Sequence, residues 1–230
     1  MTDEELEAMH TRKRERLLAR KTKKIRTIQF RRTFWILSAC FVVLLDQLSK
    51  WAVVEHVIRP AREGRSGYSF IDWYQHTPSM SPYTEIHLTS FFNIVMAWNT
   101  GVSFSLFQDT GIYTPYILIF VALGITLLFG FWLWSAEKHF HGLCNALIIG
   151  GALGNVIDRA RFGAVIDFLD FHVKGYHWPA FNVADMSVVS GISLLMIVSL
   201  FFETKTRQRY RKNNKKRRDF QKFLRERFGI

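Results

Sequence analysis

Apolar residues are concentrated in four long runs in the middle of the chain, with polar segments between them. The runs cover about Phe34–Val54, Pro115–Trp134, Leu143–Ile157 and Val183–Phe202. The second run lies within Gly111–Ala136, a stretch of 26 residues without a charged side chain. A helix needs roughly 20 apolar residues to cross a hydrocarbon core of ~30 Å. The pattern therefore predicts four membrane-spanning helices and excludes an ordinary soluble domain.

The segments between the runs predict two loops on one side of the membrane, at about residues 55–114 and 158–182. In both loops, β-prone and aromatic residues alternate with Pro, Gly and Ser. This composition favours short strands over free coil. The expected fold class is an all-α membrane protein, in which four transmembrane helices carry a small β-rich or irregular cap at the membrane surface.

Charge fixes the expected orientation. The chain has 31 Lys and Arg against 19 Asp and Glu, and its formal net charge is +12. Of the basic residues, 11 lie in Met1–Arg32 and 12 in Glu203–Ile230, whereas the loop at 55–114 holds only Arg59, Arg62 and Arg65. Basic segments stay in the cytoplasm. We therefore expect two cytoplasmic tails, residues 1–32 and 204–230, around a four-helix domain of residues 33–203 whose loops are periplasmic.

The basic tails invite a nucleic-acid interpretation, since Lys215–Arg218 would suit phosphate contacts. Basic segments beside membrane helices are already expected from topology and from attraction to anionic lipid headgroups. Membrane lipid is therefore the favoured partner, and nucleic acid is not expected. The two cysteines, Cys40 and Cys144, are too few for a disulfide framework or a Cys-rich metal site.

Ionisable residues inside membrane helices are expensive and usually mark function. Asp46 and Lys50 stand four residues apart in the first run, which places them on one face of a helix. They could form a mutually neutralising pair in the bundle interior, or support an active site. At the end of the third run, Asn155 is followed by Asp158 and Arg159, which could be a surface pair, a headgroup anchor or part of a site.

Asp167 and Asp185 are carboxylates in strongly apolar surroundings, where desolvation raises a pKa unless donors or cations compensate. If they approach within a few ångströms, they cannot both ionise and would share one proton, as in an aspartic protease. Separate helix caps or loop contacts remain open. A Ser/His/Asp site is disfavoured because all eight histidines lie in tails or loops. The sequence supplies no evident metal site and no phosphate-binding loop.

Four blocks, in order along the chain, together resemble the bacterial lipoprotein signal peptidases, or signal peptidase II. Asp46 to Lys50 resembles the family's D-Q-x-[ST]-K block, and Asn99 to Phe104 resembles its N-x-G-x-x-F block. Gly150 to Arg159, followed by Gly163 to Phe168, resembles G-G-x-x-G-N-x-x-D-R and V-x-D-F. Phe181 to Asp185 resembles F-N-x-A-D.

The resemblance implies an intramembrane aspartic endopeptidase of the bacterial inner membrane, with its site near the outer face. Its substrates would be diacylglyceryl-modified prolipoproteins, cleaved just before the lipidated cysteine. It implies no cofactor and no metal, and we expect a monomer. The catalytic pair would be Asp167 and Asp185. The residues that line the site and orient substrate would be Asp46, Lys50, Asn99, Gly101, Gly154, Asn155, Asp158, Arg159, Asn182 and Ala184.

Two other functions remain in view. The intramembrane carboxylates would also suit a small proton-coupled transporter, although the chain has no inverted repeat. A membrane scaffold that uses its basic tails is the third. The chain departs from the family pattern in its long N-terminal tail, its extended C-terminal tail and an enlarged stretch from Glu55 to Ser90.

Overall fold

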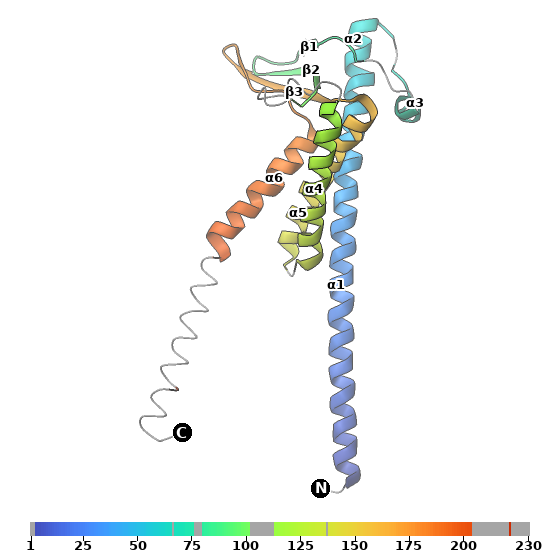
Figure 1. The fold of residues 1–230 in the computed structure, drawn as a ribbon, viewed down its shortest axis with the longest axis vertical. Helices are drawn as coiled ribbons and strands as arrows, with labels where there is room; N and C mark the ends of the chain where they lie inside the picture. The colour runs from blue at the N-terminus through green and yellow to red at the C-terminus, as the bar shows by residue number, and fades with distance from the viewer. Residues whose placement is uncertain are drawn as a thin grey trace.

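The computed structural model describes residues 3–65, 67–75, 80–101, 113–136, 138–203 and 221. Four of its helices are long and apolar enough to cross a membrane, which confirms the predicted spans. Figure 1 shows these helices carrying a small sheet at one end of the molecule. Most of the predicted C-terminal tail, and Val102 to Phe104 of the second block, lie outside the described residues.

The first helix is far longer than its apolar run. α1 covers Asp3–Val53 and continues through a π-helical turn, η1 (Val54–Ile58), into α2 (Arg59–Glu63). Gly64 ends it in the left-handed conformation, with φ of 64°. At 1.5 Å per residue α1 alone measures about 75 Å, more than twice a hydrocarbon core. The N-terminal tail is therefore helical and continuous with the span, because its Glu, Leu, Ala, Lys and Arg are good helix formers.

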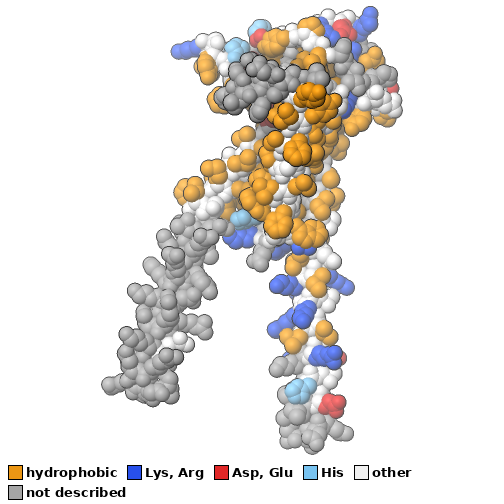
Figure 2. Space-filling view, in the orientation of Figure 1, with side chains coloured by type: hydrophobic (Ala, Val, Ile, Leu, Met, Phe, Trp, Pro, Cys, Tyr) orange, Lys and Arg blue, Asp and Glu red, His pale blue; other side chains and the backbone are white. Residues whose placement is uncertain are grey.

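The other three spans are α4 (Thr114–Ser135), α5 (His139–Phe162) and α6 (Val183–Val198), the last extended by η3 (Ser199–Glu203). α5 extends beyond the apolar run Leu143–Ile157 at both ends, because its first and last turns are helical but contain polar residues. It packs against α1, α4 and α6. A band of hydrophobic side chains covers the spans, and Lys and Arg gather on α1 below it (Figure 2).

Small residues let α5 approach its neighbours closely. A Cβ on Gly142 would lie 2.1 Å from the ring of Trp35, and one on Gly150 would lie 2.7 Å from the carbonyl oxygen of Ala39. The lack of a side chain at Gly150 therefore lets α5 approach α1 closely, as small residues do between membrane helices.

The expected cap is an antiparallel sheet of order β1-β2-β3-β4. Its strands are β1 (Thr84–His87), β2 (Phe92–Asn99), β3 (Val165–Val173) and β4 (Tyr176–His177). A short helix, α3 (Phe70–Gln75), contacts α1. Ala97 pairs with Asp167, after a register shift in β2. One face of the sheet packs on a buried apolar cluster made of Val54, Ile58, Trp73, Ile94, Met96, Ile166 and Phe168.

Candidate active site

Asp167 reaches its place through a sharp reversal of the chain after α5. The helix ends at Gly163, whose φ of 74° is left-handed and whose N–H donates to the carbonyl oxygen of Arg159 at 3.0 Å. β3 then begins, and its third residue is Asp167. The Asp167 side chain is 3% exposed, so the strand delivers a carboxyl group to the interior of the junction between the sheet and the helices.

Asp185 lies in the first turn of α6, which Asn182 caps. The Asn182 side-chain oxygen accepts from the backbone N–H of Asp185 at 3.0 Å, and the Asp185 carboxylate accepts from the backbone N–H of Asn182 at 3.2 Å. This reciprocal arrangement is a capping box, and a helix N-terminus favours a negative charge. The helix-cap role considered for Asp185 is therefore present.

Asn182 also bridges to the other carboxylate. Its side-chain Nδ2 donates to Oδ1 of Asp167 at 2.7 Å, while its backbone N–H donates to Asp185. Asn182 is fully buried. One residue therefore holds both carboxylates of the expected catalytic pair, which come from β3 and α6.

Two further amides complete the surroundings of the pair. Asn99 donates to Oδ2 of Asp167 at 3.0 Å, and Asn155 donates to Oδ1 of Asp185 at 2.8 Å. The N–H of Gly101 donates to the side-chain oxygen of Asn99 at 2.9 Å and so fixes its orientation. Gly101 has a φ of 103°, which side chains larger than hydrogen rarely adopt.

Burial, and after it the nearby negative charge of Asp185, raise the pKa of Asp167 from its ordinary value of 3.8 to about 7. The hydrogen bonds from Asn99 and Asn182, and the charge of Lys50, act in the opposite direction. Desolvation thus dominates, as expected for a carboxylate in apolar surroundings. At neutral pH this group is divided between its protonated and ionised forms, the state that general acid–base chemistry requires.

A buried ionic cluster lies next to the pair. Lys50 Nζ lies 2.8 Å from Asp46 and 2.7 Å from Asp158, and all three side chains are fully buried. Gln47 donates to both of these carboxylates, at 3.1 and 2.9 Å. Asp158 thus forms an ion pair with Lys50 across α1 and α5.

The cluster holds the backbone immediately before each member of the pair. Oδ1 of Asp46 accepts from the N–H of Ala184 at 3.0 Å, and Oδ2 of Asp158 accepts from the N–H of Ile166 at 3.1 Å. Ala184 precedes Asp185, and Ile166 precedes Asp167. Asp46 and Asp158 therefore help to position Asp185 and Asp167, respectively, through hydrogen bonds to the main chain.

Gly154 and Ala184 must be small for this junction to close. A Cβ on Gly154 would lie 2.6 Å from a carboxylate oxygen of Asp46 and 3.2 Å from the Cβ of Ala184. Arg159 is half-buried nearby, and its Nε has no hydrogen-bond partner among the described residues. All twelve residues expected at the site thus lie at one junction. Gln47 was not among the residues expected at the site, although it hydrogen-bonds both Asp46 and Asp158. Only its position next to Asp46 in the sequence could have indicated this role.

Metal binding finds no support in the described residues, where no group of three or more His, Cys, Asp or Glu side chains could hold an ion. The site is a set of carboxylates, amides and one buried lysine. Such a set can bind and activate water or hold a peptide carbonyl by hydrogen bonds.

A family model described as signal peptidase (SPase) II matches residues 38–201. The chain belongs to the signal peptidase II family. Among curated relatives, the lipoprotein signal peptidase of Teredinibacter turnerae is 36% identical over 73% of this chain and 87% of its own length. That of Burkholderia multivorans is 38% identical over 70% of this chain and 84% of its own length. As a member of this family with four helices that could cross a membrane, the protein is a membrane-bound peptidase.

Two solved structures, each described as a bacterial membrane enzyme, share the fold. One is 26% identical with a TM-score of 0.53 and covers 73% of this chain and 88% of the other. The second is 25% identical with a TM-score of 0.54 and covers 74% and 94%. The helical bundle with its small sheet is thus an architecture that membrane enzymes use.

Proposed function

We propose that this protein is an aspartic endopeptidase that removes signal peptides from diacylglyceryl-modified prolipoproteins, cleaving before the lipidated cysteine. The observation that carries the proposal is the bridge formed by Asn182, which hydrogen-bonds both Asp167 and Asp185. Processing of lipoproteins follows from the family and from its relatives' names. The catalytic type is our inference from the carboxylate pair.

In the proposed reaction, the pair shares one proton. Asp167, whose pKa of about 7 lets it carry a proton near neutral pH, is the acid of the pair, and Asp185, at the N-terminus of α6, is the base. Asp185 accepts a proton from water as the water oxygen attacks the carbonyl carbon of the scissile peptide bond. Asp167 hydrogen-bonds the carbonyl oxygen and stabilises the developing negative charge. When the C–N bond breaks, a carboxyl group donates the proton to the leaving amine.

The supporting residues act by position. Asn99, Asn155 and Asn182 orient the carboxylates, and Asp46 and Asp158 fix the main chain ahead of them. Arg159 interacts electrostatically with both Asp167 and Asp185, and its role in the proposal is to orient a substrate carbonyl beside them. Water is the nucleophile, so the proposal needs no cofactor.

The proposed orientation places both tails in the cytoplasm and the cap in the periplasm. It is supported by the Lys and Arg side chains on α1 below the hydrophobic band (Figure 2). The signal peptide would then lie in the bilayer as a helix, with the scissile bond delivered at the outer surface. The proposed enzyme works as a monomer in contact with membrane lipid, and nothing in the described site favours nucleic acid or transport.

Cleavage of a lipidated prolipoprotein by purified variants in lipid bilayers tests the proposal. Asp167→Asn and Asp185→Asn are expected to abolish cleavage while remaining folded. Asp170→Asn is the matched control, because Asp170 lies in the same strand as Asp167 and has the same 3% exposure. It is expected to keep most of the activity. Normal processing by either of the first two variants would contradict the mechanism.

A further inference from the structure

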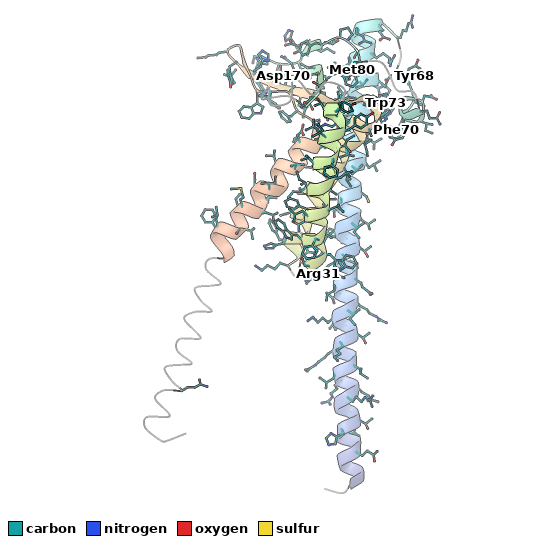
Figure 3. All side chains as sticks on the ribbon, viewed as in Figure 1. Arg31, Tyr68, Phe70, Trp73, Met80 and Asp170 are labelled. Atoms are coloured by element: carbon teal, nitrogen blue, oxygen red, sulfur yellow. The ribbon has the colours of Figure 1, made fainter. Side chains whose placement is uncertain are left out.

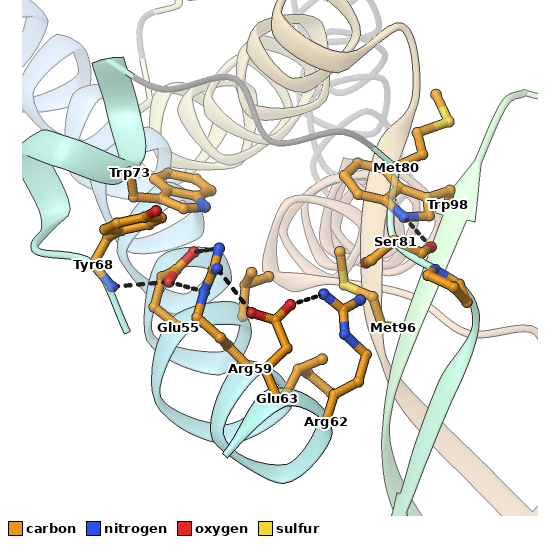
Figure 4. A pocket seen from close by; sticks show the side chains of 13 residues that line it. Glu55, Arg59, Arg62, Glu63, Tyr68, Trp73, Met80, Ser81, Met96 and Trp98 are labelled. Atoms are coloured by element: carbon orange, nitrogen blue, oxygen red, sulfur yellow. Dashed lines mark hydrogen bonds and ion pairs between the residues drawn. The ribbon is translucent and has the colours of Figure 1, made fainter. Parts of the chain in front are cut away.

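A separate cavity of about 360 Å³ lies in the cap, in the part of the chain that departs from the family pattern. One wall comes from the continuous helix of η1 and α2, a second from α3 and the residue Tyr68, and a third from residues 80–82 and β2 (Figure 4). Its size is within the range of sites that bind small molecules or peptide segments. None of the residues of the carboxylate site lines it.

The charged groups in this cavity compensate one another. Arg59 lies 2.6 Å from Glu55 and 3.3 Å from Glu63, and Arg62 pairs with Glu63 as well. Two acidic and two basic side chains therefore balance, as Figure 4 shows. The cavity consequently favours neither an anion such as a phosphate nor a cation, and suits a neutral ligand.

The cavity also contains a hydrogen-bond donor that lacks an acceptor. Trp73 is 1% exposed, and its Nε1 has no partner among the described residues. Figure 4 shows this nitrogen on the edge of the ring that faces Arg59 and the interior of the cavity. Buried donors are almost always paired, so an acceptor is missing here. A backbone carbonyl oxygen is a neutral acceptor, and the side chains of Ile58, Met80 and Met96 offer apolar surface beside it.

Trp73 is held in place by contacts with the C-terminal end of α5. The Arg161 guanidinium lies 4.2 Å above the Trp73 ring and donates to the Trp73 carbonyl oxygen at 2.8 Å. The ring also packs on Phe162, the last residue of α5. The donor is thus held in place before any ligand arrives, which lowers the entropy cost of binding.

The cavity and the carboxylate site share β2. Met96 and Trp98 line the cavity, whereas Asn99 binds Asp167 on the other face of the strand. The pairing of β1 with β2 stops at Met96, so the edge of β2 next to Asn99 is not covered by β1. A peptide that leaves the carboxylates past this edge and runs along β2 meets the cavity wall at Trp98, the residue next to Asn99.

We propose that this cavity is an exosite for the polypeptide that follows the lipidated cysteine, binding one apolar side chain and one backbone carbonyl of the mature lipoprotein. The inference rests on the proposed function. An acyl chain is a poorer occupant, because Trp73 and Met80, which line the cavity, lie at the same end of the molecule as Asp170 of the sheet (Figure 3), whereas acyl chains remain in the bilayer.

The test compares two diacylglyceryl-modified substrates with the same signal peptide. One ends two residues after the cysteine, and the other continues for ten residues of serine and asparagine with a leucine at the fifth position. The wild-type KM is expected to be lower for the long substrate. Trp73→Phe keeps the ring and removes the N–H, and it is expected to raise KM about five-fold more for the long substrate than for the short one.

A second variant fills the cavity from its mouth without touching the core. Met80 is 49% exposed, and Met80→Trp is expected to remove the advantage of the long substrate. Met196→Trp is the matched control, because Met196 is 58% exposed on α6, away from the cavity. The control is expected to preserve the advantage.

Equal wild-type KM values for the two substrates, or an equal rise for both in Trp73→Phe, would overturn the exosite. Cleavage of the short substrate reports separately on the proposed function. If neither substrate is cleaved, the dissociation constants of the two uncleaved peptides decide the exosite in the same way: tighter binding of the long peptide that Met80→Trp removes supports it, and equal binding refutes it.

Discussion

Replacing Asp167 by asparagine is expected to stabilise the folded protein at alkaline pH while removing activity. Burial, and then the charge of Asp185, raises the pKa of Asp167 to about 7 from an ordinary value of 3.8. Below pH 3.8 this carboxyl group is protonated in the folded and unfolded states alike, so it costs no stability. As the pH rises from 3.8 to 7, only the unfolded state ionises freely, and the cost grows until it levels off above pH 7.

The size of this cost follows from the two pKa values. A difference of about three pH units corresponds to about 4 kcal/mol, and with a side chain 3% exposed there is little solvent to screen it. Asparagine carries no charge at any pH. Its amide cannot accept from both Asn99 and Asn182, a loss of about 1 kcal/mol that is independent of pH. The unfolding free energy of Asp167→Asn is therefore expected to exceed that of the wild type by about 3 kcal/mol at pH 8 and to be close to the wild-type value at pH 4.5.

The assay is denaturant unfolding in detergent micelles between pH 4.5 and pH 8, followed by tryptophan fluorescence. Asp170→Asn is again the control. Its carboxylate accepts from Asn93 at 3.0 Å and lies 2.8 Å from Nδ1 of His177, so its replacement is expected to destabilise the protein. A stability difference between Asp167→Asn and wild type that does not change with pH would refute the reasoning.

Three further variants probe the supporting residues. Lys50→Met leaves the carboxylates of Asp46 and Asp158 buried without a cation, so it is expected to lower the unfolding free energy by about 3 to 5 kcal/mol. Denaturant unfolding measures this change, and a loss below about 1 kcal/mol would contradict the expectation. Gly154→Ala is expected to displace Asp46 and lower cleavage at least ten-fold, whereas Gly130→Ala, where a Cβ meets nothing within 4 Å, leaves cleavage unchanged. Asn182→Ala is expected to lower kcat and to change KM much less. An unchanged kcat would show that the hydrogen bonds of Asn182 to Asp167 and Asp185 are not needed for the reaction.

The spans were predictable because the apolar pattern is a property of sequence alone. Their ends were not. The N-terminal tail is charged, so hydropathy excludes it, yet it continues α1 as helix because its residues favour helix. α5 extends beyond Leu143–Ile157 for a similar reason, since Asp158 and Arg159 are polar but helical.

That the twelve expected residues lie at one junction was predictable, because the motif blocks name them together. Their contacts were not. The spacing of Asn182 and Asp185 is that of a capping box and could have predicted the start of α6. Nothing in the sequence indicated that Asn182 also reaches Asp167, because Asp167 lies 15 positions earlier, on β3, which meets the start of α6 only in the folded chain.

The separation of the nearest carboxylate oxygens of Asp167 and Asp185, in a structure with a bound uncleavable lipopeptide, tests the central claim most directly. A single water that hydrogen-bonds both carboxylates requires about 5.6 Å or less, since each hydrogen bond measures about 2.8 Å. The account predicts a separation within that limit, with the scissile carbonyl beside it. A separation well above 6 Å, with the peptide in place, would contradict a proton-sharing pair.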